Sequence, residues 1–239
     1  GRVHLIENNN FWASRGRSLY RSFDRGANWK KVLSLTLPIS LHLCSMSRLS
    51  RRLSRMCINH VIRVDVNSIV IVGFGYIFFY STLLDEITAK HLLKGKRPLV
   101  VCAHNGKLIY GEYGNNPGYK PMALIAVDEE IGSRVIFSFD NIRHIHGVNC
   151  DPIDGSLWIT TGDNDDESTI WHMSTLEAQP QPILSGSQQS RAVQLLFDKS
   201  YIYFGTDTPL EQNYIYRLDR VNFRVQRLHP VSNSVFYGC

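Results

Sequence analysis

Short apolar runs recur along the chain, and turn-forming residues separate them. The run "IVIVGFGYIFFY" (69–80) predicts two buried strands joined by a turn, because it is rich in β-branched and aromatic residues. Three later turn signals fall where a second strand must begin: Asn105-Gly106, Asp154-Gly155 and Asp198-Lys199-Ser200. No apolar run approaches the roughly 18 residues that a membrane-spanning helix needs. The pattern therefore predicts an all-β protein without a transmembrane segment.

Five segments share one rhythm of four short strands, and the first strands of the last four begin about 40 to 46 residues apart. This spacing is the length of a four-stranded propeller blade. A single blade cannot bury both of its faces, so we expect successive blades to stack around an axis. The sequence predicts one β-propeller domain over residues 1–239, with five recognisable blades and the start of a sixth in "SNSVFYGC" (232–239). Because the chain begins Gly-Arg-Val and ends inside a strand-like segment, we expect it to be a fragment.

One segment breaks the pattern and predicts an amphipathic helix inserted between the first two blades, over residues 37–59. Apolar residues stand there at near-helical spacing, and a run of arginines lies between them: Leu41, Cys44, Leu49 and Leu53, with Arg48, Arg51, Arg52 and Arg55. Such a helix either packs against the propeller rim with its arginines in water, or docks on a membrane surface or partner protein. Peripheral membrane contact through this helix stays open.

Charge and cysteine content narrow the function classes. The net charge of +5 is modest, and much of it sits in the arginine run, so the chain lacks the spread basic surface of a nucleic-acid-binding protein. The five cysteines are odd in number and widely spaced, which predicts neither a disulfide framework nor a metal-binding cysteine pair. Reduced cysteines favour a cytoplasmic protein, although a fragment leaves the compartment unknown.

Propeller geometry sorts the polar residues into two groups on one face. Antiparallel alternation within a blade brings the loops that enter first strands to the same side as the loops between second and third strands. The entry group comprises His60, Arg143, His144, His146, Gln188, Gln189 and Arg191. The second group comprises Glu112, Tyr113, Asp163, Asp165, Asp166 and Asp207. We expect these side chains to form a polar cup over the central channel.

Each part of the cup also has a plainer interpretation. An aspartate that follows glycine at a strand end, as Asp163 does, often caps a turn. The His144-x-His146 spacing places both imidazoles on one face of a strand, where they either hold a metal with a third ligand from elsewhere or serve the structure alone. "DNDDES" lacks the ligand spacing of a calcium loop. No cofactor or metal is predicted, and His144 and His146 are the weak metal candidates.

The stretch "SFDRGANW" (22–29) fits the pattern S-x-D-x-G-x-x-W and resembles the Asp-box of sialidase-like BNR-repeat β-propellers. The matching positions are Ser22, Asp24, Gly26 and Trp29, and Asn28 stands where that family commonly has threonine. The resemblance implies a hairpin between third and fourth strands. Asp24 would accept backbone hydrogen bonds, Gly26 would take a positive φ, and Trp29 would bury its ring between strands. The box is then a structural marker away from the ligand face.

The resemblance implies either an enzyme that acts on sugars or a binding module without catalysis. A sialidase-like glycoside hydrolase would use Tyr113 as nucleophile with Glu112, Asp163 as acid/base, and Arg143 and Arg191 for a substrate carboxylate. The sialidase R-I-P signature is absent, however, and only one clear Asp-box is present. "RHIHG" (143–147) also suits a propeller polysaccharide lyase. We favour a non-catalytic module that binds a glycan or a protein through Arg143, His144, His146, Arg191 and Asp207.

Overall fold

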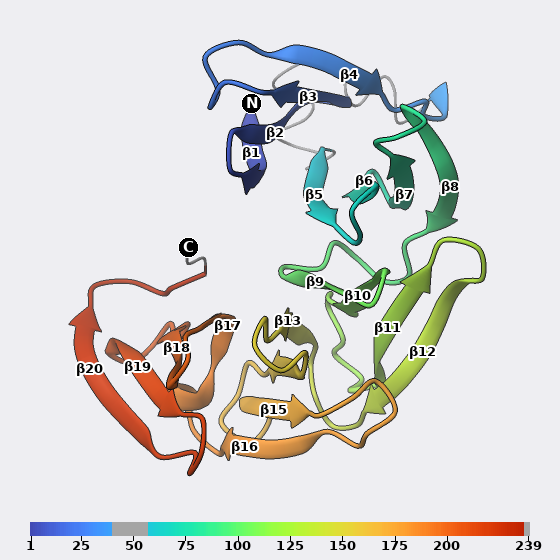
Figure 1. Ribbon diagram of the computed structural model, residues 1–239. Coiled ribbons are helices and arrows are strands. Elements are labelled where there is room, and N and C mark those ends of the chain that lie inside the picture. The colour runs from blue at the N-terminus through green and yellow to red at the C-terminus, as the bar shows by residue number, and fades with distance from the viewer. Residues whose placement is uncertain (40–56, 237–239) are drawn as a thin grey trace. The chain divides into compact units, whose positions relative to one another are not determined.

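The computed structural model describes residues 1–39 and 57–236, and these residues fold almost entirely into β-strands. Twenty strands form five four-stranded antiparallel sheets, and each sheet is a meander of strands consecutive in the chain (Figure 1). A short 3₁₀ turn, η1 (Gln188–Ser190), precedes the last sheet. The predicted all-β class and the four-stranded repeat are therefore confirmed.

Contacts divide the chain into two compact units, one of residues 1–94 with 128–132 and one of residues 95–127 with 133–239. The first unit holds two sheets, whose strands are β1 (Arg2–Glu7), β2 (Asn10–Arg15), β3 (Ser18–Ser22), β4 (Lys30–Ser34), β5 (Ile58–Arg63), β6 (Ser68–Gly73), β7 (Tyr76–Ser81) and β8 (Glu86–Leu92). Its apolar core includes Trp12, Ile71 and Phe78, each 2% exposed or less. The predicted strand pair at 69–80 is present as β6 and β7, and Phe74 and Gly75 form the turn with positive φ.

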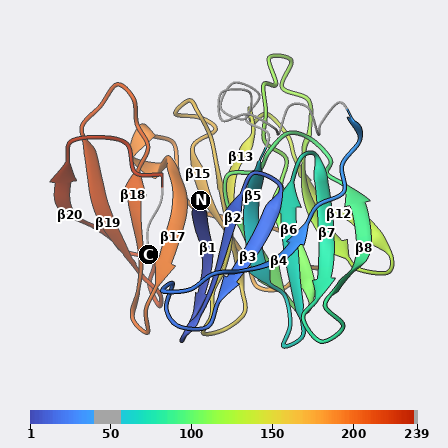
Figure 2. The same cartoon turned by 90° about the horizontal axis from the view of Figure 1, so that it is seen from above.

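The remaining strands form three sheets. They are β9 (Val101–His104), β10 (Lys107–Gly111), β11 (Met122–Asp128), β12 (Gly132–Phe139), β13 (Ile145–Cys150), β14 (Leu157–Thr161), β15 (Thr169–Met173), β16 (Gln181–Ser185), β17 (Ala192–Phe197), β18 (Tyr201–Thr206), β19 (Asn213–Asp219) and β20 (Val225–Val231). Figure 2 shows the strands of one sheet, such as β17 to β20, lying side by side. The first strands of these sheets pack against their neighbours, β13 against β9 and β10, and β17 against β13 and β14.

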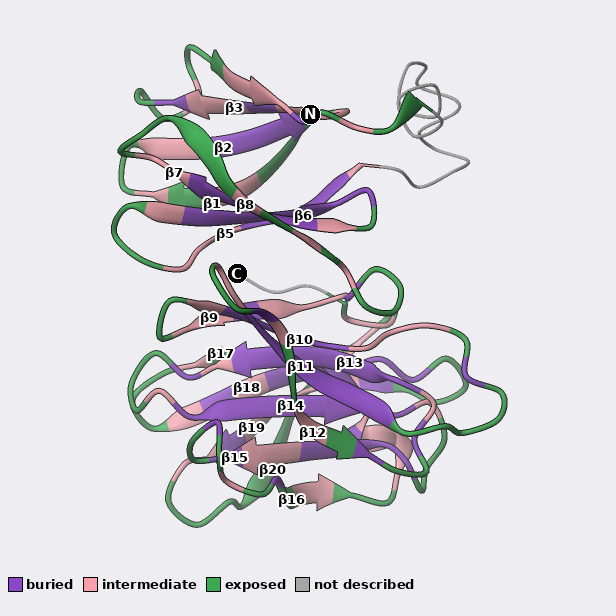
Figure 3. Cartoon of the chain, turned by 90° about the vertical axis from the view of Figure 1, so that its right-hand side faces the viewer, coloured by how far each residue is buried: buried purple, intermediate pink, exposed green. Residues whose placement is uncertain are grey.

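Burial within each sheet follows from this packing. The inner strands β10, β14 and β18 are largely buried, whereas the fourth strands β16 and β20 are mostly exposed or half-buried (Figure 3). The side chains between successive sheets form the apolar cores of the second unit, which include Ile109, Ile145, Ile159, Trp158 and Phe204. A strand buried on both faces reads as a continuous apolar run, as "LIYG" and "LWIT" do.

Local turn predictions hold wherever the turn chemistry is strong. Asn105 and Gly106 both have positive φ and join β9 to β10 in a two-residue hairpin. Gly155 has a φ of +75° in the turn before β14. These positions needed only local information, because φ above zero is open to glycine and tolerated by asparagine.

The structure differs from the sequence analysis at the end of the predicted helical insertion and at the predicted start of a sixth blade. The helix predicted over 37–59 falls mainly on residues 40–56, which lie outside the described residues, and Ile58 and Asn59 belong to β5 instead. Residues 232–236 form no strand, so the described part of the sixth-blade segment is not a strand. Val235 nevertheless donates a backbone hydrogen bond to Thr206 after Gly205, as Ile145 does to Glu112 after Gly111. A single domain over 1–239 remains a prediction.

The "SFDRGANW" stretch lies at the turn between β3 and β4, as expected. Asp24 accepts hydrogen bonds from the Asn28 backbone at 2.8 Å and from the Ser22 hydroxyl at 2.7 Å, and these bonds lower the pKa of Asp24 to about 2. Gly26 has a φ of +90°. The expected burial of Trp29 is wrong, because its side chain is 39% exposed and lies at the surface over Gly26 and Phe11. The turn is held by hydrogen bonds more than by a buried ring.

Candidate functional site

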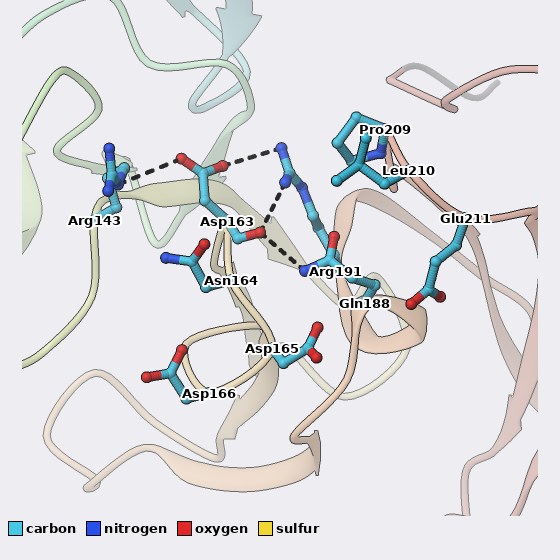
Figure 4. A pocket seen from close by; sticks show the side chains of 10 residues that line it. All are labelled: Arg143, Asp163, Asn164, Asp165, Asp166, Gln188, Arg191, Pro209, Leu210 and Glu211. Carbon is cyan, nitrogen blue, oxygen red and sulfur yellow. Dashed lines mark hydrogen bonds and ion pairs between the residues drawn. The ribbon is translucent and has the colours of Figure 1, made fainter.

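A pocket of about 730 Å³ opens in the second unit, and loops from successive sheets line it (Figure 4). The loop between β14 and β15 contributes four of its residues, and the segments before β13 and β17 and after β18 contribute the others. The lining residues are Arg143, Asp163, Asn164, Asp165, Asp166, Gln188, Arg191, Pro209, Leu210 and Glu211. The sequence therefore correctly predicted that first-strand entries and loops between second and third strands would meet on one face of this unit.

Asp163 is the centre of the polar cluster, and the local backbone fixes its position. The preceding Gly162 has a φ of +140°, a conformation that other residues rarely adopt, and a Cβ added there would lie 2.6 Å from the Ser168 hydroxyl. The Ser168 hydroxyl donates a 2.7 Å hydrogen bond to the backbone oxygen of Asn164, which closes the loop. From this turn the Asp163 carboxylate points toward Arg143, which precedes β13, and toward Arg191, which precedes β17 (Figure 4).

Two arginines pair with Asp163 from opposite sides. The Arg191 guanidinium lies 3.0 Å from one carboxylate oxygen, and Arg143 Nε lies 3.8 Å from the other (Figure 4). Arg191 also donates to the Asp163 backbone oxygen at 2.9 Å and pairs with the buried Asp207 at 3.5 Å. Burial acts to raise the pKa of Asp163, but hydrogen bonding to His146 and the charge of Arg191 outweigh it and hold the pKa below its ordinary value. Asp163 is therefore an anion at neutral pH.

The two histidines lie beneath the same carboxylate. Their Nε2 atoms are 3.1 Å apart, and Asp163 Oδ1 lies 3.6 Å from that of His144 and 3.4 Å from that of His146. His146 lies at the register shift in the β13–β14 pair between Ile145 and Gly147, where the strand has a β-bulge or irregularity. The side chains of His144 and His146 are only 9% and 2% exposed. Burial, together with the neighbouring His146, lowers the pKa of His144, which favours the neutral imidazole.

Two further residues predicted from the sequence have different outcomes. The Tyr113 ring packs against His144 with ring centres 4.4 Å apart, and burial with the nearby Asp163 charge raises the pKa of its hydroxyl. Glu112 instead accepts a 2.9 Å hydrogen bond from the backbone of Ala123, and it is not among the residues that line the pocket. His60 belongs to β5 in the first unit, whereas the pocket lies in the second.

Sequence reasoning missed the buried carboxylate that organises the pocket wall. Glu167, 2% exposed, accepts hydrogen bonds from the backbone nitrogens of Arg143 and Asn164. The Tyr119 hydroxyl joins the same network, because it donates to Glu167 at 3.4 Å and accepts from Arg143 at 3.2 Å. The signal available in the sequence was the position of Glu167 at the end of the acidic run "DNDDE", where an apolar strand follows directly.

In the described part of the chain, no helix is long and apolar enough to cross a membrane. No protein-family model and no curated protein matches the sequence. Among solved structures, a chain of a nidogen–laminin complex is similar with a TM-score of 0.58 and 9% identity, over 93% of this chain and 76% of that chain.

Two bacterial structures are similar at the same level. A puromycin-hydrolysing peptidase of Mycobacterium tuberculosis gives a TM-score of 0.59 at 12% identity, and TolB of Acinetobacter baumannii gives 0.55 at 15%. They cover 96% and 91% of this chain, which spans 39% and 50% of theirs. At such identities the likeness concerns the fold alone. Together with the five four-stranded meanders, it shows that the chain has a fold of the β-propeller type.

Proposed function

We propose that this chain is a non-catalytic binding module of the β-propeller type and that the pocket around Asp163 takes a glycan. The observation that carries the proposal is the pocket itself, where four separate segments bring hydrogen-bond donors and acceptors into one hollow of about 730 Å³. Pockets of this size suit a small ligand or a short oligosaccharide.

The mixture of groups supports a ligand rich in hydroxyls. A sugar hydroxyl both donates and accepts, so it can donate to the exposed carboxylates Asp165, Asp166 and Glu211 and accept from an arginine or from Gln188. Arg143 and Arg191 each have a buried Nε–H with no hydrogen-bond acceptor among the described residues. Arg143 Nε lies 3.8 Å from the Asp163 carboxylate, beyond hydrogen-bonding distance, so a ligand oxygen can accept a hydrogen bond from either Nε–H.

The charge balance supports a neutral glycan over an anionic one. Four carboxylates line the pocket and only two guanidinium groups oppose them, so the lining carries a formal excess of two negative charges. An acidic sugar would meet this excess at its rim. The relation to sialidase-like propellers is part of the proposal and rests on the "SFDRGANW" turn, where Asp24, Ser22 and Asn28 form a closed set of hydrogen bonds.

A glycoside hydrolase of the sialidase kind is less well supported. Its acid/base candidate, Asp163, is held by two arginines, and Glu112 bonds to the backbone of Ala123. Burial and the Asp163 charge raise the pKa of Tyr113 above its ordinary value, so the nucleophilic phenolate is harder to form than for a free tyrosine. These contacts favour binding without hydrolysis.

A glycan array followed by calorimetry tests the proposal. We expect a neutral oligosaccharide to bind and the Arg191→Met variant to weaken binding at least tenfold, because Arg191 lines the pocket and holds Asp163. The matched control is Arg134→Met, since Arg134 is exposed on β12 and does not line the pocket. No binding to any glycan, or equal binding by both variants, contradicts the proposal. Turnover of a bound glycan would support the hydrolase instead.

A further inference from the structure

Three side-chain atoms of kinds that commonly bind metal ions lie close together around the Asp163 carboxylate. His144 Nε2, His146 Nε2 and Asp163 Oδ1 all lie within 4.8 Å of one another. His144 directly precedes β13, His146 lies within β13, and Asp163 lies in the loop that follows β14, so packing between two segments of one sheet brings them together. The proposed glycan contacts do not require the two histidines, which leaves their arrangement unexplained.

Hydrogen bonds on the far side of each ring fix which nitrogen carries the proton. His144 Nδ1 lies 3.2 Å from the backbone oxygen of Gly114, and His146 Nδ1 lies 3.2 Å from that of Ala192. A carbonyl oxygen only accepts, so each Nδ1 must donate. In the neutral imidazoles both Nε2 atoms then present lone pairs, and they face each other and the carboxylate of Asp163.

At these distances the lone pairs of the two Nε2 atoms and the Asp163 carboxylate repel one another unless a cation, either a proton or a metal ion, lies among them. A cation placed among them removes this repulsion, and a histidine whose other nitrogen donates to a backbone carbonyl is the usual arrangement around a bound metal. We propose that His144, His146 and Asp163 form a binding site for a divalent transition-metal ion. Two imidazoles and one carboxylate suit Zn²⁺ and its first-row neighbours better than Mg²⁺ or Ca²⁺, which prefer oxygen ligands.

The distances fit such an ion. Atoms separated by 3.1, 3.6 and 3.4 Å lie on a circle with a radius of about 2.0 Å, close to the roughly 2.0–2.1 Å of a zinc–nitrogen bond. An ion slightly out of their plane sees the three donors at angles close to tetrahedral. Three protein ligands leave at least one position for water or a ligand oxygen, as in catalytic zinc sites.

Charge around the site also favours a cation. The pocket lining has an excess of two negative charges, which a divalent ion compensates. An Arg191 guanidinium nitrogen lies 3.0 Å from the Asp163 oxygen that the ion would bind. The same nitrogen lies 3.5 Å from Asp207, which offers it a second partner. The arginine can therefore remain paired when the ion binds.

Metal binding does not rest on the proposed glycan, so the two are tested apart. The protein is stripped with a chelator, and Zn²⁺ binding is measured by calorimetry without any sugar present. Co²⁺ titration adds a spectroscopic reading, because visible absorption bands report the coordination geometry. We expect one ion per chain in the wild type, a tetrahedral-type Co²⁺ spectrum and a higher Tm with Zn²⁺.

Two variants and two controls make the test specific. Asp163→Asn and the double variant His144→Ala/His146→Ala should lose more affinity than the roughly 10- to 100-fold that removal of an outer hydrogen-bond partner costs. Glu177→Gln removes an exposed carboxylate outside the pocket, and His229→Ala removes an exposed imidazole on β20; both should bind as the wild type does. If the double histidine variant fails to fold, the near-isosteric Asp163→Asn variant still tests whether this site binds the ion.

The proposal is overturned if the wild type binds no Zn²⁺ or Co²⁺ stoichiometrically. It is also overturned if Asp163→Asn binds the ion as tightly as Glu177→Gln does. Metal binding by the wild type with no glycan binding would support this site and contradict only the function proposed above.

Discussion

The contact between Gly111 and Ile145 gives the sharpest packing prediction, because it supports the strand that carries the histidines. Gly111 ends β10, and a Cβ added there would lie 2.2 Å from Ile145 Cγ2 and 2.4 Å from Ile145 Cβ. Ile145 is 1% exposed and begins β13 between His144 and His146. The overlap involves the Ile145 Cβ, so a side-chain rotation cannot relieve it and the backbone must move.

Gly111→Ala should therefore cost about 3 kcal/mol, the upper part of the range for overpacked cores. For a chain of this length that loss lowers Tm by roughly 6–12 °C. The assay is thermal and urea unfolding followed by circular dichroism. Gly118→Ala is the control, because Gly118 lacks a positive φ and has open space around it, and it should change stability by less than about 0.5 kcal/mol. Equal stability of the two variants would refute the described packing of β10 on β13.

Three other perturbations follow from single contacts. Trp29→Ala should cost only about 1–2 kcal/mol in urea unfolding, since Trp29 is 39% exposed; the roughly 3–5 kcal/mol of a core tryptophan would contradict its surface position. Burial lowers the pKa of His4 from 6.5 to about 3, so between these values the unfolded chain binds a proton that the folded chain does not. The free energy of unfolding should then fall by up to roughly 5 kcal/mol as pH drops from 6.5 toward 3, and His4→Gln should remove that part of the pH dependence; an unchanged pH profile would rule it out. Gly162→Ala should strain the turn by roughly 1–3 kcal/mol and weaken Zn²⁺ binding through displacement of Asp163, whereas wild-type affinity would show that the turn does not position the carboxylate.

The elements of the fold were predictable where the signal is local. Asn105-Gly106 and the run at 69–80 carry their turn chemistry and strand propensity within a few residues, so the hairpins follow from the sequence alone. The meeting of Asp163 with Arg143 and Arg191 was also predictable, because antiparallel alternation assigns their loops to one face.

Other features depend on contacts that no local pattern contains. The register shift at His146 and the 3.1 Å approach of its Nε2 to that of His144 depend on strand pairing and packing, whereas alternation alone places both rings merely on one face. Glu112 and Asp163 follow second strands alike, yet Glu112 bonds to Ala123 on the neighbouring strand. The Asp-box-like turn has the expected hydrogen bonds of Asp24, yet the Trp29 ring of the same motif lies at the surface.

The proposed site requires that segments far apart in the sequence meet at the Asp163 carboxylate. A double-mutant cycle measures the interaction energy between Asp163 and Arg191 directly. Asp163→Asn and Arg191→Met are combined, and the free energy of unfolding is determined with a chelator present. Because Arg191 lies 3.0 Å from Asp163 and both are largely shielded from water, we predict a coupling energy of about 1–2 kcal/mol. The cycle of Asp163→Asn with Arg134→Met, on an exposed arginine, should be additive within about 0.5 kcal/mol. Additivity in both cycles would contradict the proposed cluster.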